Sequence, residues 1–155
     1  MRTAYKTLSW LIAAEVVVQA AAMVYAISGL FIWVDRDGGV LDKAAIEGEE
    51  TFPEIVGFIL HGINGMVVIP ALALLLLIVS LFAKIPGGVM WAGLVLLAVV
   101  VQVTLGMFGH ELALAGLLHG VNALVLFTTA LYAGWRVRRQ PLRSRAEGTA
   151  EAARV

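Results

Sequence analysis

Four long apolar stretches dominate this chain of 155 residues. A helix that crosses a membrane needs about 20 mostly apolar residues, and the candidate spans are residues 7–29 (34 at most), 54–83, 89–109 and 112–135. Because the hydrocarbon core holds no water to bond open backbone groups, each span must be helical. With 61% apolar and only 14% charged residues, the composition excludes an ordinary soluble enzyme and a disordered protein.

Short turns separate the later spans. Residues 85–88 read Ile-Pro-Gly-Gly, and residues 109–111 form the connection between the third and fourth spans. Short connections place consecutive helices side by side, which predicts an all-α membrane protein folded as an antiparallel up-down four-helix transmembrane bundle over residues 1–135. Pro70 lies inside the second span, where we expect it to kink the helix.

The basic residues predict the orientation of the bundle. Lys and Arg precede the first span, occur in the turn after the second, and follow the fourth, whereas the loop at 30–53 carries six acids and two bases. By the positive-inside rule, both termini are cytoplasmic and the loop is outside. We expect an integral protein of a bacterial plasma membrane, with a basic cytoplasmic tail at 136–155 held by anionic lipids.

Net charge and cysteine content exclude several functions. The formal net charge is zero, which argues against a nucleic-acid partner. The chain has no Cys, so it can hold neither a Cys-ligated metal nor a haem attached through C-x-x-C-H.

The sequence repeats itself. Residues 16–19 read Val-Val-Val-Gln, as do residues 99–102; residues 61–65 read His-Gly-Ile-Asn-Gly, and residues 119–123 read His-Gly-Val-Asn-Ala. The order is a Gln helix, a His helix, a Gln helix and a His helix. This predicts two repeated helical hairpins, related by an axis along the membrane normal.

The repeat bears on the first span. The basic start and Ala20–Ala22 resemble a cleaved signal peptide. However, Glu15 interrupts the apolar stretch and the repeat needs this span, so we expect it to be retained. By the same alignment the span leaves the membrane near Ser28–Gly29, with residues 30–33 along the outer interface.

The two span histidines lie at similar depth. His61 follows Glu54 by seven residues and His119 follows Glu111 by eight, which places them about 10 and 12 Å below the outer surface at 1.5 Å per residue. The second and fourth spans are diagonal in an up-down bundle, so the two imidazoles can meet across its axis. We predict a b-type haem (haem b) near the outer leaflet, with His61 and His119 as ligands to its iron.

The surroundings of each histidine suit this prediction. Small residues one turn away leave room for a flat macrocycle, namely Gly57, Gly65, Ala115 and Ala123. A ligating histidine donates its other ring N–H to an oxygen, which a backbone carbonyl or one of four amides could supply: Gln19, Gln102, Asn64 and Asn122.

Alternatives remain open. Small residues and amides also pack membrane helices without any cofactor, whereas two His without a carboxylate make a poor site for a bare metal. Glu54 and Glu111 are helix-start acids or partners of haem propionates, and His110 is an exposed turn residue or a further contact. Glu15 is expected near the cytoplasmic end, far from the histidines and near Lys84, with a proton, quinone or structural role.

The pattern of His61 in the second helix and His119 in the fourth resembles one four-helix half of haem A synthase, over about Leu8 to Trp135. The resemblance implies haem ligation by paired histidines. That family has two such bundles and oxidises a haem methyl group; this chain has one, and no matching acidic motif, so the reaction is not carried over. The chain is also similar to small uncharacterised four-span membrane proteins with His in spans 2 and 4, which implies no activity.

These features together predict a membrane cytochrome of the b type rather than a catalyst, because two His ligands leave the iron no open position. Its role would be electron transfer at the outer side, or haem binding and hand-over. The partners expected besides the lipid bilayer are a redox partner or larger membrane complex, and a second copy in a homodimer. The rivals are a cofactor-free membrane subunit and a small proton- or quinone-linked membrane protein.

Overall fold

The chain folds into a helical bundle. The computed structural model describes residues 1–43, 45 and 52–137. Regular structure in these residues is helical throughout, in the order α1 (Arg2–Arg36), 3₁₀ turn η1 (Pro53–Ile55), α3 (Val56–Ile63), π-helical turn η2 (Asn64–Val68), α4 (Ile69–Ala83), α5 (Gly88–Phe108) and α6 (Ala113–Trp135).

The prediction of an all-α protein with four membrane-length helices is confirmed. Residues 53–83 count as one long helix, so the described chain has four helices long and apolar enough to cross a membrane. Large apolar side chains stay exposed along them, for example Val24 at 64%, Leu97 at 58% and Leu124 at 67%. Such extensive apolar surface suits a lipid bilayer and not water. Two parts of the predicted topology lie outside the described residues. They are the acidic loop residues 47, 49 and 50 and the basic tail beyond residue 137.

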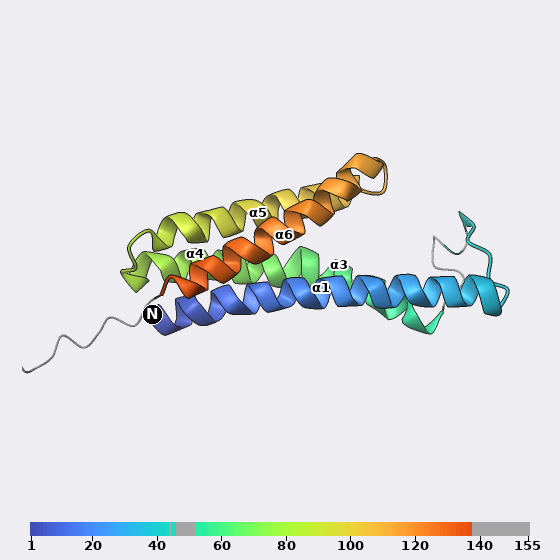
Figure 1. Ribbon diagram of the computed structural model, residues 1–155, viewed down its shortest axis with the longest axis horizontal. Helices are drawn as coiled ribbons and strands as arrows, with labels where there is room; N and C mark the ends of the chain where they lie inside the picture. The colour runs from blue at the N-terminus through green and yellow to red at the C-terminus, as the bar shows by residue number, and fades with distance from the viewer. Residues whose placement is uncertain (44, 46–51, 138–155) are drawn as a thin grey trace, which may run out of the picture.

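The long helices lie side by side along one axis (Figure 1). One end of the bundle, which we call the terminal end, holds the start of α1, the turn between α4 and α5, and the last turn of α6. The other, the loop end, holds the end of α1 and the α5–α6 turn. Both α1 and α5 pack against α4 and α6, and α1 also packs against α3. The second and fourth spans therefore lie mainly against α1 and α5 rather than against each other.

The core occupies the terminal half of the bundle. Its largest fully buried side chains include Tyr5, Ile12, Leu76 and Leu126. The Tyr5 hydroxyl donates a buried hydrogen bond to the Gly88 carbonyl at 3.0 Å, which ties the start of α1 to the start of α5. In a membrane such a bond is favoured because no water competes for either group.

Toward the loop end the core stops. On the four spans in turn, the core residues that lie nearest to the loop end are Ala13, Ile69, Val99 and Leu126. Beyond them, the α1–α3 pair and the α5–α6 pair diverge (Figure 1). The few residues buried there are small, except for Phe52, and include Ala26, Gly29, Gly57 and Ala115. The two histidine-bearing segments thus lie past the end of the packed core.

The first helix extends beyond the predicted membrane span. The expectation that the span leaves the membrane near Ser28–Gly29 stays a prediction, while α1 itself continues to Arg36. An unbroken helix keeps satisfying its own backbone groups, and Gly29 lets the Glu54 side chain pack directly against it. Trp33 then stacks on Phe52 with ring centres 5.7 Å apart. The helix ends where Gly38 adopts φ +73°, a left-handed conformation that favours glycine.

Pro70 is preceded by a change of helix type. Proline has no amide N–H to give to the turn before it, and its ring crowds that turn. The structure places the π-helical turn η2 between α3 and Pro70. Such insertions are common near functional sites. Here the turn separates the core segment α4 from the histidine segment α3.

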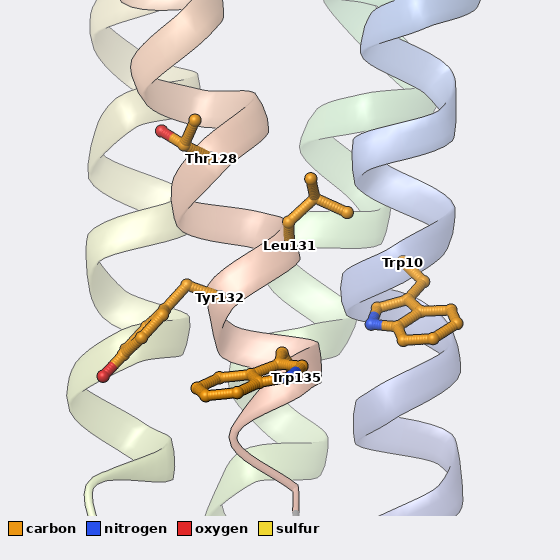
Figure 2. Close-up of a pocket in the computed structure, with 5 residues that line it drawn as sticks. All are labelled: Trp10, Thr128, Leu131, Tyr132 and Trp135. Atoms are coloured by element: carbon orange, nitrogen blue, oxygen red, sulfur yellow. The ribbon is translucent and has the colours of Figure 1, made fainter.

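Aromatic rings surround the terminal end. Trp10 of α1 and Tyr132 and Trp135 of α6 border a shallow apolar hollow (Figure 2), whose lining is completed by Thr128 and Leu131. The Lys6 ammonium lies 4.9 Å from the centre of the Trp10 ring, and the Arg136 guanidinium lies 5.7 Å from that of Tyr132. Amphipathic rings beside cations are typical of a membrane–water interface. The hollow contains no titratable cluster, so we place the candidate site elsewhere.

Gly57 should be sensitive to substitution because a Cβ there would lie 2.9 Å from the Ala26 Cβ and even closer to the Ala22 carbonyl oxygen. We expect Gly57→Ala to lower the free energy of unfolding by about 1–3 kcal/mol, since α3 must move away from α1. Gly93→Ala is the matched control, as a Cβ there meets nothing within 4 Å. Unfolding in mixed micelles measures both, and equal stability of the two variants would contradict this packing.

Candidate functional site

The two span histidines meet across the bundle. His61 lies on α3 and His119 on α6, and both side chains are half-buried. Their ring centres are 6.1 Å apart, with the ring planes inclined by 53°. Helices that lie diagonally in the bundle therefore bring together two imidazoles from positions 58 residues apart (119 − 61).

Each ring is held by a backbone carbonyl of its own hairpin. The Nδ1 atom of His61 lies 3.2 Å from the Gln19 carbonyl oxygen, and that of His119 lies 3.0 Å from the Gln102 carbonyl oxygen. A carbonyl oxygen only accepts hydrogen bonds, so each Nδ1 must carry the proton and donate it. In a neutral imidazole the Nε2 atom then keeps a free lone pair, directed away from that carbonyl.

This arrangement suits a metal bound between the rings. An imidazole nitrogen binds a transition metal at about 2 Å and lies about 1 Å from its ring centre, so two rings on opposite sides of one metal have centres about 6 Å apart. The described residues contain no group of three or more His, Cys, Asp or Glu side chains able to hold a metal ion. A bare ion would lack ligands here, whereas haem brings the nitrogens of its own macrocycle and needs only two axial ligands.

The amides join the two helices of each hairpin. In the second hairpin the Asn122 amide donates to Gln102 Oε1 at 2.7 Å and to the Ala98 carbonyl at 2.9 Å. In the first hairpin Gln19 Nε2 donates to the His61 carbonyl at 3.0 Å. These bonds fix each His helix against its Gln helix, and hence fix where each imidazole lies. The amide side chains themselves do not bond the rings.

The small residues near each histidine lie in different surroundings. Gly57 and Gly65 lie against α1, because a Cβ on the first would strike the Ala22 carbonyl and one on the second would lie 2.6 Å from Gln19 Nε2. They allow the close approach of two helices. Ala115 is buried and Ala123 half-buried. That the four leave room for a macrocycle stays a prediction.

The expected position of Glu15 is wrong. Its Oε2 atom accepts a hydrogen bond from the Asn64 amide at 2.9 Å, so it lies beside the His-Gly-Ile-Asn segment and not beside Lys84. The reason is that α1 starts at Arg2, which puts Glu15 about 20 Å along the helix at 1.5 Å per residue. Glu15 therefore lies well along the bundle from its terminal end, at the level of Asn64.

Sequence reasoning missed Gly106. A Cβ at this position of α5 would lie 3.1 Å from both Cε1 and Nδ1 of His119. The missing side chain therefore lets the imidazole lie directly against α5, within reach of the Gln102 carbonyl. The available signal was its spacing, four residues after Gln102 and so on the same helix face.

The polar residues at the loop end stay apart from the histidine pair. The Glu54 side chain packs on Gly29, while His110 and Glu111 are exposed in the turn between α5 and α6. Neither acid contributes a ligand at the level of the rings. Their role as haem-propionate partners stays a prediction.

The hydrogen bonds of the site predict its tautomers. We expect both His61 and His119 to carry the proton on Nδ1, because each Nδ1 faces a carbonyl oxygen. Nitrogen-15 NMR of histidine-labelled protein in lipid, assigned with single His→Gln variants, measures this directly. The exposed His110 serves as the internal reference for a solvated ring. An Nε2–H tautomer at either site position would contradict the arrangement.

Comparisons with family models, with curated proteins and with solved structures found no match for this chain.

Proposed function

We propose that this protein is a membrane haem protein of the b type, with His61 and His119 as the two axial ligands. One observation carries the proposal: two imidazoles from diagonal spans face each other with centres 6.1 Å apart, each with Nδ1 against a backbone carbonyl. Ligating histidines commonly show this pattern, in which the second nitrogen is oriented by an oxygen acceptor.

The packing of the bundle supports the same function. The core ends before the level of the histidines. A cofactor between the α1–α3 and α5–α6 pairs would complete the core there. Bound haem would supply a one-electron couple in a site shielded from water by apolar helices.

The residues of the chain would have separate tasks. His61 and His119 hold the iron, and the Gln19 and Gln102 carbonyls orient their rings. The Asn122–Gln102 bond stabilises the hairpin that carries His119. Two His ligands would leave the iron no open position for oxygen chemistry, so we assign electron transfer, or haem binding and hand-over.

The proposal extends to the topology and the partners. It comprises an antiparallel bundle of two repeated hairpins, both termini cytoplasmic and the haem near the outer leaflet of a bacterial plasma membrane. The matching contacts from the His61 and His119 rings to the Gln19 and Gln102 carbonyls support the repeat. A redox partner or larger membrane complex would meet the outer side, and two copies can pair as a homodimer.

A cofactor-free membrane subunit is the second candidate. It is favoured by the fact that amides of the site already bond within the hairpins, as between Asn122 and Gln102. Interhelical bonds of this kind stabilise membrane helices without any ligand. The two functions differ in a spectroscopic property, the presence of haem bands.

The reduced-minus-oxidised absorption spectrum of the detergent-purified protein tests the haem. We expect sharp bands at about one haem per chain, lost or shifted in His61→Ala and in His119→Ala, because each variant removes one axial ligand. The matched control is His110→Ala, whose side chain is exposed in a turn. Its spectrum should be unchanged. A parent protein that stays colourless when haem is supplied during expression would overturn the proposal in favour of the cofactor-free subunit.

Labelling of single cysteines tests the orientation, since the chain has none of its own. We expect Val40→Cys to react with a membrane-impermeant thiol reagent in intact cells, and Thr3→Cys to react only after the membrane is opened. The positions lie at the two ends of α1, one just past its end and the other in its first turn. The reverse pattern would place the histidine pair near the inner leaflet.

A further inference from the structure

The two hairpins differ at one buried position. In the second, the Asn122 amide bonds the Gln102 side chain. In the first, the corresponding Asn64 amide bonds Glu15 instead. Glu15 precedes Gln19 by four residues, and the residue in the same place before Gln102 is Ala98. Glu15 thus accepts the hydrogen bond from Asn64, whereas in the second hairpin Gln102 accepts the corresponding bond from Asn122.

This exchange leaves one oxygen without a partner. Among the described residues, Gln19 Oε1 is buried and accepts no hydrogen bond. Gln19 Nε2 already donates to the His61 carbonyl. Rotating the amide by half a turn would therefore place Gln19 Oε1 against the His61 carbonyl oxygen, and neither atom can donate. A buried acceptor without a donor is unfavourable and rare. In the first hairpin the side-chain oxygen of the glutamine therefore lacks a donor, whereas in the second hairpin Asn122 supplies one.

A proton on Glu15 would supply that donor. An ionised carboxylate only accepts hydrogen bonds, whereas a protonated carboxyl has one O–H to give. Side chains four residues apart lie next to each other on one helix face, so the Glu15 carboxyl is a neighbour of the Gln19 side chain. The neutral form also avoids the cost of a charge deep in the membrane.

Among the described residues, Glu15 has no counter-ion. In the described part of the chain no basic side chain pairs with it, and its hydrogen-bond partner is the neutral Asn64 amide. The elements packed against α1 carry Glu54 on η1, His61 on α3, and His119 and Tyr132 on α6, while η2 and α4 carry no titratable side chain. The titratable groups nearest to it along the bundle are therefore the two histidines, which lie about one turn closer to the loop end.

We propose that Glu15 binds the proton that accompanies reduction of the site between His61 and His119. This inference rests on the proposed haem function. Bound haem would supply the one-electron couple. When one electron arrives from a one-electron donor, the Glu15 carboxylate would take one proton from the aqueous phase and become a neutral carboxyl. Oxidation reverses both steps. The proton balances the added electron where low polarity makes uncompensated charge costly.

Potentiometric titration of the haem bands at several pH values tests this coupling, with dithionite as reductant and ferricyanide as oxidant. We expect the midpoint potential of the parent protein to fall by up to about 59 mV per pH unit, the value for one proton per electron. In Glu15→Gln the slope should be largely lost with the haem bands retained. Asp35→Asn is the matched control, because it removes an exposed acid from the same helix.

Two further measurements separate proton binding from a structural role. The reduced-minus-oxidised infrared spectrum of the parent should gain the carbonyl band of a protonated carboxyl, absent in Glu15→Gln. The double variant Glu15→Gln, Ala98→Glu moves the acid to the equivalent position of the second hairpin and should restore the pH dependence.

The outcomes are distinguishable. Haem bands with the same pH slope in the parent and in Glu15→Gln would overturn the role of Glu15 and leave the haem function standing. The absence of haem bands in the parent would overturn both. If Glu15→Gln loses its haem, the infrared spectrum of the parent decides, and a spectrum without the carboxyl band rejects the inference.

Discussion

The hydrogen bond from each imidazole Nδ1 to a glutamine carbonyl oxygen is the interaction on which the site depends. The carbonyl belongs to a helical backbone but still has a lone pair to accept a second hydrogen bond. By accepting from His61 or His119, it sets the tautomer and turns each Nε2 away from its own hairpin. No water competes for these groups in the hydrocarbon, so one such bond per ring suffices to hold it. Close helix packing makes the bond possible: Gly57 of α3 and Gly65 of η2 let the second span approach α1, and Gly106 lets the His119 ring lie against α5.

The terminal half and the loop half of the bundle have different roles. The terminal half has the continuous core and the buried Tyr5–Gly88 bond, and it holds the four helices together. The loop half has little core between its two helix pairs, and it carries the polar residues. This division lets a packed helical framework position the two histidines beyond the end of its core. The turn η2 lies at the boundary between the two halves on the second span.

Much of the framework could be predicted from the sequence, because long apolar stretches in a chain of this composition can only be membrane helices. Residue counts along straight helices also predicted that His61 and His119 lie at one level, where they can meet. The prediction that failed concerned a contact between helices. Glu15 was expected near the cytoplasmic end and Lys84, but its carboxylate accepts a hydrogen bond from Asn64 of the neighbouring span.

By itself the sequence determined the four spans, the duplicated His-Gly-x-Asn motif and the absence of any cysteine ligand, since these depend on composition and spacing along the chain. Only the tertiary structure decided that the imidazoles lie 6.1 Å apart, that backbone carbonyls and not amide side chains hold them, and that Asn64 bonds Glu15 while Asn122 bonds Gln102. The physical reason is that helix periodicity assigns a residue to a face and a depth, whereas the partner it meets depends on the rotation and distance of the neighbouring helix. Those are set by which small residues lie at each crossing.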